Sequence, residues 1–488
     1  MTQKMDLAQA LGLAFAHLEQ KRLPEARKLA RSIEKVRSDA PGLAYLHGLL
    51  ALADGQGRKA ALHLSKALAA TPDAPPLLLA MARAQSLQGR RDEAEALYRR
   101  LPGMLEAEAE LAALLLQRRD WAGAAELLRN RPLSAGALNN LGVAEQALGH
   151  IEAAAIAFAQ AIDSDPGYAR PQANLAGVLR RLKRPADAHD AALRATRLAP
   201  QDASGWIELG QALRGLNRLD DALDALSQAR NSLEADWLRG EILERLDRKA
   251  EAAAAYRRVL KRDGSDVFGA ALALARLEGG QAPDRAPSAF VAALYDRYAE
   301  VFDQDLRQGL QYRAPELLLE AVRATLGDGP FDCLDLGCGT GLVGEVMQPV
   351  LHAVDGVDLS PAMIDKARQR GFYRSLGVGE LTAAADRPGA YDLITAADVL
   401  IYLGDLKAAF AACAGALKTG GGFAFTVEKR DDGQDYAVQP SKRFAHSAAY
   451  LERLAGEHGF RVLRIEDNWT RTENSREVPG LVCVLMKD

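Results

Sequence analysis

The sequence has little cysteine, few aromatic residues and no long hydrophobic run. Its 488 residues include only 4 cysteines, and the aromatic residues together make up 6%. None of these cysteines are paired at metal-binding spacing, and all lie in the last third of the chain: Cys333, Cys338, Cys413 and Cys483. Such cysteines are typical of small core residues in a reducing compartment. The sequence therefore predicts a cytoplasmic protein without a metal centre.

The charge balance and the hydropathy exclude two further classes of protein. The 61 Lys and Arg residues and the 65 Asp and Glu residues leave a net charge of -4, so there is no global basic field for nucleic acid. No apolar run approaches the ~20 residues that span a bilayer. The first apolar stretch is interrupted by His17, Glu19 and Gln20, unlike a signal peptide. We expect neither a nucleic-acid partner nor a membrane partner.

A glycine-rich segment follows a short apolar run in the last third of the chain. Residues 331–336 predict a strand, and glycines at 337, 339 and 341 precede a helix expected to begin near Leu342. A strand, a tight glycine turn and a helix N-terminus form the mononucleotide seat of a doubly wound α/β sheet. The spacing Gly-x-Gly-x-Gly differs from the dinucleotide pattern. The neighbouring Asp335 disfavours a pyrophosphate and favours a cationic ligand that carries an amino acid.

This segment resembles motif I of class I S-adenosylmethionine (SAM) methyltransferases, which reads Asp-x-Gly-x-Gly-x-Gly. In that family the motif binds the methionine end of SAM. The resemblance implies that SAM is the cofactor and S-adenosylhomocysteine the product. It assigns the following residues of this chain to the cofactor site: Asp335, Gly337, Cys338, Gly339 and Gly341.

A second motif at the expected separation supports this interpretation. Residues 352–358 predict a strand that ends in Asp358, 17 residues after Gly341. A carboxylate at this strand tip can accept hydrogen bonds from both ribose hydroxyls. Ser360 can cap the helix that follows. Leu359 and Met363 complete the predicted site, with the polarizable sulfur of Met363 against the adenine ring.

The first half of the chain is an internal repeat. Small residues recur at intervals of 34 or 30, in two series that stay in register over eight units. The first series is Ala26, Ala60, Ala94, Ala124, Ala154, Ala188, Ala222 and Ala252. The second lies twelve residues earlier in each unit: Ala14, Gly48, Ala82, Ala112, Gly142, Ala176, Gly210 and Gly240. The pattern resembles tetratricopeptide (TPR) repeats, which are helical hairpins that stack into a solenoid with a concave groove.

Polar side chains repeat at positions that should face this groove. Asn140 and Asn174 occupy the same slot of successive repeats, and Arg180 and Arg214 are also 34 residues apart. A side-chain amide can donate one hydrogen bond to a peptide backbone and accept another. These residues predict a groove for an extended, partly acidic peptide, although each of them could equally be an ordinary surface residue.

The segment between the two halves sharpens the resemblance. Gly279–Pro287 predicts a linker, and residues 290–312 are aromatic and acidic. This lead-in resembles that of predicted bacterial SAM methyltransferases with TPR repeats in front, a likeness that covers nearly the whole chain. In that group the segment lies over the SAM pocket. The resemblance implies lid roles for Tyr295, Tyr298 and Tyr312, and a contact of Arg313 with the SAM carboxylate. For the tyrosines a core position is an open alternative, and for Phe302 we favour it.

Further candidates lie around the predicted acceptor side. Asp398 lies in the exit of the fourth predicted strand (strand and exit together, residues 391–399) at the switch point of the sheet, with Tyr402 four residues later. Glu380 stands where the family places residues near adenine. Residues 439–447 predict a loop in which Arg443 can bind a substrate carboxylate and His446 can take a proton or cap the next helix. The predicted catalytic residues are Asp398, Tyr402, Arg443 and His446.

Together these patterns predict a multidomain protein. We expect an all-α TPR solenoid of about eight hairpins plus a capping helix in residues 1–280, a linker and lid in 281–325, and a Rossmann-like methyltransferase domain in 326–488. The expected sheet has seven strands, the last antiparallel. The favoured function is a SAM-dependent methyltransferase that modifies a side chain of a protein or peptide held in the TPR groove. The alternatives are a small-molecule methyltransferase docked through its repeats and a non-catalytic SAM-binding scaffold.

Overall fold

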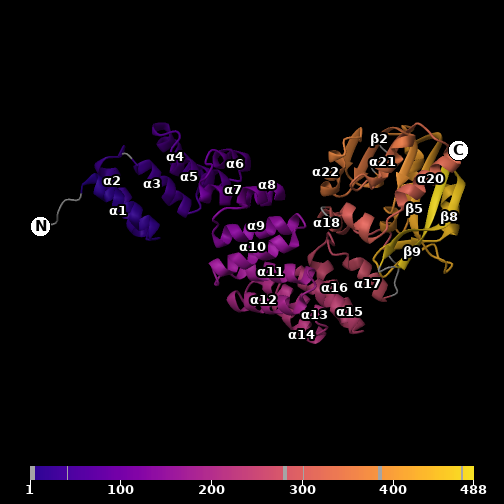
Figure 1. Cartoon of the computed structure of the whole chain (residues 1–488), viewed down its shortest axis with the longest axis horizontal. Helices are drawn as coiled ribbons and strands as arrows, with labels where there is room; N and C mark the ends of the chain where they lie inside the picture. The colour runs from indigo at the N-terminus through magenta and orange to yellow at the C-terminus, as the bar shows by residue number, and fades with distance from the viewer. Residues whose placement is uncertain (1–5, 41, 279–282, 300–301, 383–386, 474–475) are drawn as a thin grey trace. The chain divides into compact units, whose positions relative to one another are not determined.

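The computed structural model describes residues 6–40, 42–278, 283–299, 302–382, 387–473 and 476–488. The chain divides into two compact units, Met1–Ala199 and Pro200–Asp488. The second unit combines the last helices of the repeat array with the whole α/β domain (Figure 1). Part of the predicted linker, residues 279–282, lies outside the described residues. The sequence-based division at residues 280 and 325 stays a prediction.

The first unit is built from consecutive helices. Adjacent helices pair as hairpins, and residues with positive φ end the first helix of a pair, as at Gly149 (φ 82°). The helices are α1 (Leu7–Glu19), α2 (Leu23–Val36), α3 (Leu43–Ala53), α4 (Gly57–Ala70), α5 (Pro75–Leu87), α6 (Arg91–Arg99), α7 (Leu105–Gln117), α8 (Trp121–Leu128), α9 (Ala135–Ala147), α10 (Ile151–Ser164), α11 (Ala169–Arg181) and α12 (Pro185–Leu198).

The second unit begins with five more helices of the same kind. Two further pairs are followed by a single helix, where the sequence predicts half a repeat. These helices are α13 (Ala203–Gly215), α14 (Leu219–Gln228), α15 (Leu233–Arg245), α16 (Lys249–Arg262) and α17 (Ala270–Glu278).

The two series of small residues explain why the helices pair so closely. All eight alanines of the first series are fully buried. In six of the eight units the second series stands opposite a large side chain sixteen residues later. A Cβ added at Gly142 would lie 2.5 Å from Phe158, and one added at Gly240 would lie 2.3 Å from Tyr256. Because interiors are close-packed, the rings of Phe158 and Tyr256 lie where Gly142 and Gly240 carry no side chain.

The α/β domain contains one mixed sheet with the strand order β3-β2-β1-β4-β5 in its parallel part. β9 lies antiparallel between β5 and β8. The strands are β1 (Phe331–Leu336), β2 (Leu351–Asp358), β3 (Ser375–Val378), β4 (Tyr391–Ala396), β5 (Leu417–Lys429), β6 (Tyr436–Val438), β7 (Phe444–His446), β8 (Phe460–Glu473) and β9 (Arg476–Lys487). The order reverses between β1 and β4, which places a ligand crevice at their carboxyl ends.

Helices cover both faces of this sheet (Figure 1). One core cluster joins the sheet to α20 and α21, through residues such as Leu318 and Met347. A second joins the other face to α23 and α24, through residues such as Phe410 and Leu454. The helices of the domain are α18 (Ser288–Tyr298), α19 (Phe302–Gln304), α20 (Ala314–Leu326), α21 (Leu342–Met347), α22 (Pro361–Gln369), α23 (Lys407–Ala416) and α24 (Ala448–Glu457), with a π-helical turn at Asp305–Gly309.

The mostly parallel sheet with an antiparallel last strand is confirmed, but the predicted number of seven strands is wrong. The described part of the sheet has nine strands, because β6 and β7 add a short hairpin beyond β5. Residues 439–447 were expected to be a loop, and Phe444–His446 instead pairs with β5 and β6. The strand β8 runs from Phe460 to Glu473, and β9 pairs with it along that length.

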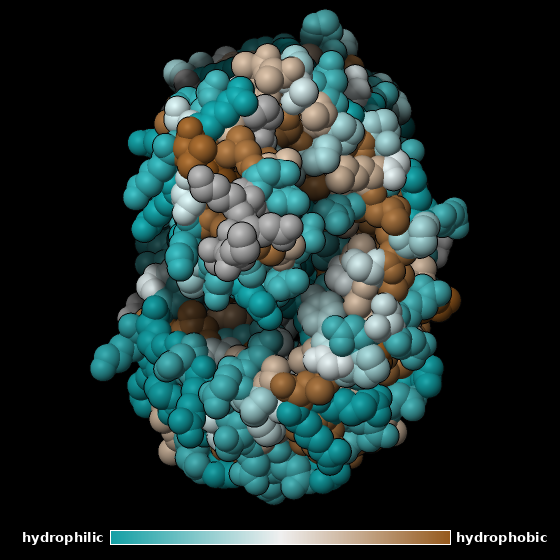
Figure 2. Space-filling model, turned by 90° about the vertical axis from the view of Figure 1, so that its left-hand side faces the viewer, coloured by the Kyte–Doolittle hydropathy of each residue, from teal (hydrophilic) through white to brown (hydrophobic). Residues whose placement is uncertain are grey.

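Large hydrophobic side chains on the surface are scattered rather than gathered. Those exposed include Val36, Leu62 and Ile156, which belong to different helices. The face shown in Figure 2 is mostly hydrophilic, with small separate hydrophobic groups. Within the described residues no helix combines the length and apolar character needed to cross a bilayer.

Candidate functional site

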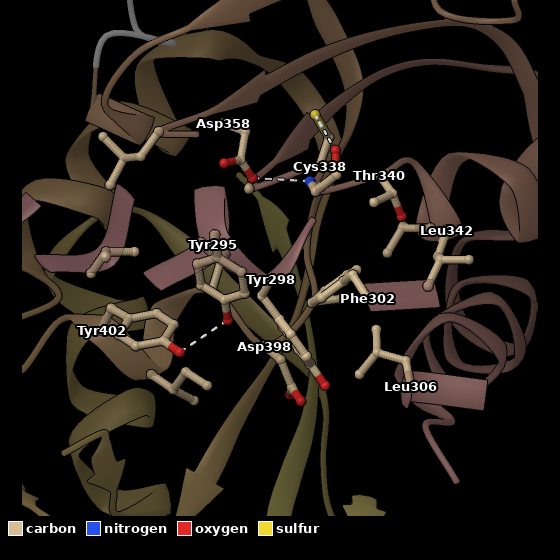
Figure 3. A pocket seen from close by; sticks show the side chains of 18 of the residues that line it. Tyr295, Tyr298, Phe302, Leu306, Cys338, Thr340, Leu342, Asp358, Asp398 and Tyr402 are labelled. Atoms are coloured by element: carbon tan, nitrogen blue, oxygen red, sulfur yellow. Dashed lines mark hydrogen bonds between the residues drawn. The ribbon is translucent and has the colours of Figure 1, made fainter. Parts of the chain in front are cut away.

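A pocket of about 310 Å³ lies at the carboxyl ends of β1, β2 and β4. Its lining comes from the glycine loop after β1, the tip of β2, the segment after β4, the helices α18 and α19, and the end of β8. In Figure 3, Asp358 and Cys338 lie at one end, and Tyr402 and Asp398 lie at the other. The wall between these ends is rich in aromatic rings: Tyr295, Tyr298, Phe302, Tyr312 and Tyr402.

Three glycines shape the loop after β1, and each is needed for a different reason. All three have positive φ, with values of 63° at Gly337, 53° at Gly339 and 95° at Gly341. A Cβ at Gly337 would lie 2.3 Å from Val399, and one at Gly341 would lie 2.9 Å from Arg370. At Gly339 the nearest atom would be 3.7 Å away, on the far side of the pocket, in Phe302. Gly339 therefore presents bare backbone to the pocket.

Asp358 ends β2 and faces the same pocket. One of its carboxylate oxygens accepts a hydrogen bond from the Gly339 amide at 2.9 Å, and the other accepts one from the Ser360 amide at 2.8 Å. Each oxygen keeps a second lone pair for a ligand hydroxyl. Burial raises the pKa of Asp358, and the nearby Asp296 carboxylate adds to this. The predicted partners Gly337, Cys338, Gly339, Asp358 and Leu359 all line the pocket.

Asp335 lies beneath the glycine loop and does not line the pocket. Its carboxylate accepts hydrogen bonds from the Tyr373 hydroxyl at 2.8 Å and the Thr395 hydroxyl at 2.9 Å. Burial raises its pKa to about 6, partly opposed by these two bonds. Any influence of Asp335 on a cationic ligand therefore acts through its charge and through the loop above it.

The predicted lid is held to the glycine loop and to α22 by polar contacts. Asp296 of α18 accepts a hydrogen bond from the Ser360 hydroxyl at 2.7 Å. Asp303 of α19 accepts one from the Thr340 hydroxyl and pairs with Arg370. Between these contacts Tyr295, Tyr298 and Phe302 pack edge to face. Phe302, expected to be a core residue, lines the pocket together with the two tyrosines.

A network of charged side chains closes the other end of the pocket. Arg471 pairs with Asp398 at 2.6 Å, with Glu473 at 3.0 Å and also with Glu428. Arg443 pairs with Glu428 at 2.7 Å and also with Glu473. Although burial opposes its charge, Asp398 and Glu428 raise the pKa of Arg471. Burial acts to raise the pKa of Glu473, but the two arginines hold it below its ordinary value.

Asp398 and Tyr402 take fixed positions beside this network. Asp398 has an unusual positive φ of 51°, and its carboxylate accepts hydrogen bonds from Thr426 at 2.8 Å and Thr470 at 3.2 Å. The Tyr402 hydroxyl lies 2.9 Å from that of Tyr295 (Figure 3). Burial raises the pKa of Tyr402, and it also holds the pKa values of Tyr295 and Tyr312 well above their ordinary value.

Besides Asp335, five residues predicted for the cofactor and catalytic sites do not line this pocket: Gly341, Met363, Glu380, Arg313 and His446. Met363 is fully buried, and Glu380 pairs with Arg285 at 2.5 Å. The Arg313 guanidinium lies 4.2 Å above the Trp469 ring. The Nε2 atom of His446 lies 3.2 Å from the Gly404 carbonyl oxygen, and burial lowers the pKa of His446 to about 4. The alternative in which His446 caps α24 is wrong, because the Ser447 hydroxyl caps that helix.

The predicted groove residues lie on first helices of their hairpins. In the first unit, Asn140 is half-buried on α9, and Asn174 of α11 donates a hydrogen bond to Asn139 at 2.9 Å. Arg180 lies on the same helix as Asn174. In the second unit, Arg214 of α13 pairs with Glu241 of α15 at 3.1 Å. Their role in peptide binding stays a prediction.

Sequence reasoning missed Arg471, Glu473 and Glu428. These residues lie in a polar stretch of β8 and at the end of β5, and their charged side chains meet only when the sheet forms. The available signal is the alternation Thr470-Arg471-Thr472-Glu473, in which every second residue points to the same face of a strand. Within the described residues no group of three or more side chains is arranged to hold a metal ion.

Comparison with known proteins agrees with this architecture. Residues 295–465 match the family model described as a methyltransferase domain. Residues 51–115, 109–169, 174–232 and 225–267 match two tetratricopeptide-repeat models. A ubiquinone biosynthesis O-methyltransferase of Bordetella pertussis is 33% identical over 129 residues, which are 23% of this chain and 53% of the relative. Methyltransferase-like protein 27 of Homo sapiens is 40% identical over 87 residues, 17% of this chain and 35% of the relative.

The chain thus spans about half the length, or less, of these curated relatives. Among solved structures, the magnesium protoporphyrin IX methyltransferase of Synechocystis PCC 6803 with bound SAM has a TM-score of 0.33 and 17% identity, covering 41% of this chain and 97% of its own. The Cut9–Hcn1 hetero-tetramer has a TM-score of 0.43 and 17% identity, covering 55% of each chain. This chain carries TPR repeats followed by a methyltransferase domain.

Proposed function

We propose that this protein is a SAM-dependent methyltransferase whose TPR array holds a protein or peptide, on which the C-terminal domain methylates a side chain. The observation that carries the proposal is the meeting of two motifs at one pocket. The bare backbone of Gly339 and the carboxylate of Asp358 lie 2.9 Å apart, N to O, at the switch point of the sheet.

The residues of this pocket suit the cofactor. Gly337 and Gly339 leave a cradle along the loop that a side chain would fill or strain. Asp358 offers free lone pairs where ribose hydroxyls would donate. The buried carboxylates of Asp335 and Asp358 favour a ligand with positive charge. When bound, SAM supplies a methyl group on a sulfonium: a lone pair of the acceptor forms the new bond to the methyl carbon, and the electron pair of the broken carbon–sulfur bond stays on sulfur.

The side chains of the pocket are suited to alignment rather than to proton removal. Asp398 is fixed by Thr426, Thr470 and Arg471, so its role is to hold the segment after β4 in place. Raised pKa values keep Tyr295, Tyr312 and Tyr402 protonated at neutral pH, so these hydroxyls orient an acceptor instead of deprotonating it. Alignment and exclusion of water in such a transfer are worth up to ~7–11 kcal/mol.

The proposal that the acceptor is a protein or peptide rests on the repeats. TPR arrays form concave surfaces that bind other chains. Asn140 is half-buried on the first helix of its hairpin, within reach of a backbone laid along α9. Asn174 uses one amide hydrogen for Asn139 and retains the other, together with its carbonyl.

A small-molecule acceptor is the second candidate, because the pocket itself is apolar and aromatic. Five aromatic rings line it: Tyr295, Tyr298, Phe302, Tyr312 and Tyr402. Several curated relatives are named ubiquinone biosynthesis O-methyltransferase, and ubiquinone is a small molecule. In this alternative the repeats dock the enzyme to a complex and do not hold the acceptor.

Methyl-labelled SAM added to the full-length protein and cell lysate separates these functions. Label on a polypeptide supports the first proposal, and label in small metabolites supports the second. Binding of SAM without any transfer would favour a scaffold and contradict both. An Asp358→Ala variant is the control, because any label transferred in its presence comes from other enzymes of the lysate.

A further inference from the structure

The hairpin β6–β7 joins the end of the repeat array to the pocket within the second unit. Its tip is a tight turn in which the Gln439 amide donates to the Arg443 carbonyl at 2.7 Å and the Lys442 amide donates to Gln439 at 2.9 Å. Lys442 has a backbone φ of 65°, in the left-handed region that residues other than glycine rarely adopt. Such strain persists only where the surroundings compensate for it.

The compensating contact is a notch on α15, formed by Trp237 and Glu241. The Lys442 ammonium lies 4.0 Å above the Trp237 ring and 3.4 Å from a Glu241 carboxylate oxygen. The other oxygen of Glu241 pairs with Arg214, which fixes the carboxylate. Trp237 is held in turn by Phe268 and Tyr256 at centroid distances of 6.1 and 4.9 Å. An aromatic face beside a carboxylate is a binding site for a cation.

Arg443 and Phe444, the two residues that follow Lys442, contact different parts of the second unit. Arg443 lines the pocket and pairs with Glu428 at 2.7 Å and with Glu473. Phe444 is fully buried in a cluster that contains Leu272 of α17 and Tyr402 of the pocket. Three consecutive side chains thus connect α15, the ionic network and the wall of the pocket.

We propose that the Trp237–Glu241 notch is a cation-binding site that holds Lys442, and that this docking positions Arg443 in the pocket. Lys442 is a positioning residue: it touches neither the cradle for SAM nor the ionic network, and it acts through its neighbour. In this proposal Arg214 does not bind an acidic peptide. It pairs instead with Glu241, the carboxylate that holds Lys442.

Hydrogen–deuterium exchange of the full-length protein tests the docking. Lys442→Met should speed exchange of the amides in 436–446 by roughly 2- to 30-fold, the range expected for one cation–π contact. Glu241→Gln, which removes the ion-pair partner but leaves the Trp237 ring in place, should speed it by a smaller factor. The double variant should exchange no faster than the faster single variant, because both changes remove the same contact. Lys442→Arg keeps the cation and should retain the protection of the wild type. Lys418→Met, which removes a pair with Asp392 elsewhere in the domain, is the control and should leave the hairpin unchanged.

The side-chain Nε–H resonance of Arg443 tests the positioning. This group donates to Glu428 at 2.7 Å, and its signal can be assigned with an Arg443→Lys variant. We expect the signal to shift in Lys442→Met and to return to its wild-type position in Lys442→Arg. Neither measurement needs methyl transfer, so a failure here differs from a failure of the proposed function.

Several results would overturn the inference. Unchanged exchange in both single variants would show that the notch does not hold the hairpin, and additive effects would show two unrelated contacts. Faster exchange with an unmoved Arg443 signal would show docking without positioning. Failure of Lys442→Arg to restore either readout would show that the charge is not what is recognised.

Discussion

At the scale of single residues, the pocket depends on carboxylates whose surroundings differ sharply. Asp335 is 1% exposed and has a pKa of about 6, because burial disfavours its charge. Asp355, on the neighbouring strand, is also little exposed, but its pKa is lowered, since Arg374 and the hydroxyls of Ser375 and Tyr391 outweigh burial. Contact with an arginine, rather than the depth of burial, decides whether the pKa of the carboxyl group is raised or lowered.

The raised pKa of Asp335 gives the first prediction. A cationic ligand favours the ionised carboxylate. The affinity for SAM should therefore be highest well above pH 6 and should fall as the pH drops through that value. Between pH 8 and pH 5 the decrease should reach up to about tenfold. Calorimetric titrations at both pH values measure it. Asp335→Asn should bind more weakly at pH 8 and depend less on pH, and an unaltered slope would assign the dependence to Asp358 instead.

His446 gives a prediction about stability. Burial lowers its pKa from 6.5 to about 4, so the unfolded chain binds a proton more readily than the folded one between these values. The free energy of unfolding should therefore be unaffected above pH 6.5 and should decrease by ~2 kcal/mol between pH 8 and pH 5. Urea unfolding of wild type and His446→Gln compares the two slopes. Glutamine can still donate to the Gly404 carbonyl but does not titrate, and equal slopes would contradict the assigned burial of a neutral imidazole.

The site residues that the sequence revealed are those tied to backbone geometry. Gly337, Gly339 and Asp358 stand at the ends of strands, where the local pattern predicts their place. Arg471 could not be found in this way, because its partners Asp398 and Glu428 come from other strands and meet it only in the folded sheet. Tyr295 and Tyr402 are 107 residues apart in the chain, and their hydroxyl contact likewise follows from packing alone.

At the scale of elements, the helical hairpins are explained by complementary sizes across the seam. Gly142 faces Phe158, whereas the same positions in the preceding hairpin hold Ala112 and Leu128, which are all but fully buried. The Leu128 side chain is shorter than the Phe158 ring, so it leaves room for the methyl group of Ala112 on the facing helix. The eight-unit register was visible in the sequence for this reason. The length of β8 was not, because its polar second half resembles a loop until β9 pairs with it.

This packing rule predicts the effect of Gly142→Ala. The added methyl would overlap the Phe158 ring, and overpacking of this kind reduces stability by about 1–3 kcal/mol. Adding Phe158→Leu recreates the Ala112–Leu128 combination and should recover part of the loss. Urea unfolding measures both. Gly136→Ala on the same helix has no neighbour within 4 Å and should be neutral or slightly stabilising, so destabilisation there would point to a general effect of α9.

At the scale of the whole molecule, the repeats and the pocket must cooperate if the acceptor is a polypeptide. Substituting Asn140 and Asn174 by alanine should reduce label transfer to polypeptides at least about tenfold, as expected for loss of hydrogen bonds worth ~1.4 kcal/mol or more in sum. Affinity for SAM should not change. Gln160→Ala, on the exposed side of α10, is the matched control.

Because Asn174 also holds the buried Asn139, the folding of the double variant is checked by urea unfolding. Unchanged transfer by a folded variant would contradict the groove assignment. In that case the small-molecule alternative, with the repeats as a docking module, would gain support.

The most direct test of the whole account is isothermal calorimetry of the purified full-length protein with SAM and S-adenosylhomocysteine. The account predicts saturable binding of both. It also predicts at least about tenfold weaker binding for Asp358→Ala, which loses a charged acceptor. Asp365→Ala, an exposed carboxylate of α22 that pairs with Arg368, should bind like the wild type. Absence of binding at millimolar ligand, or equal binding by the Asp358 variant, would contradict the account.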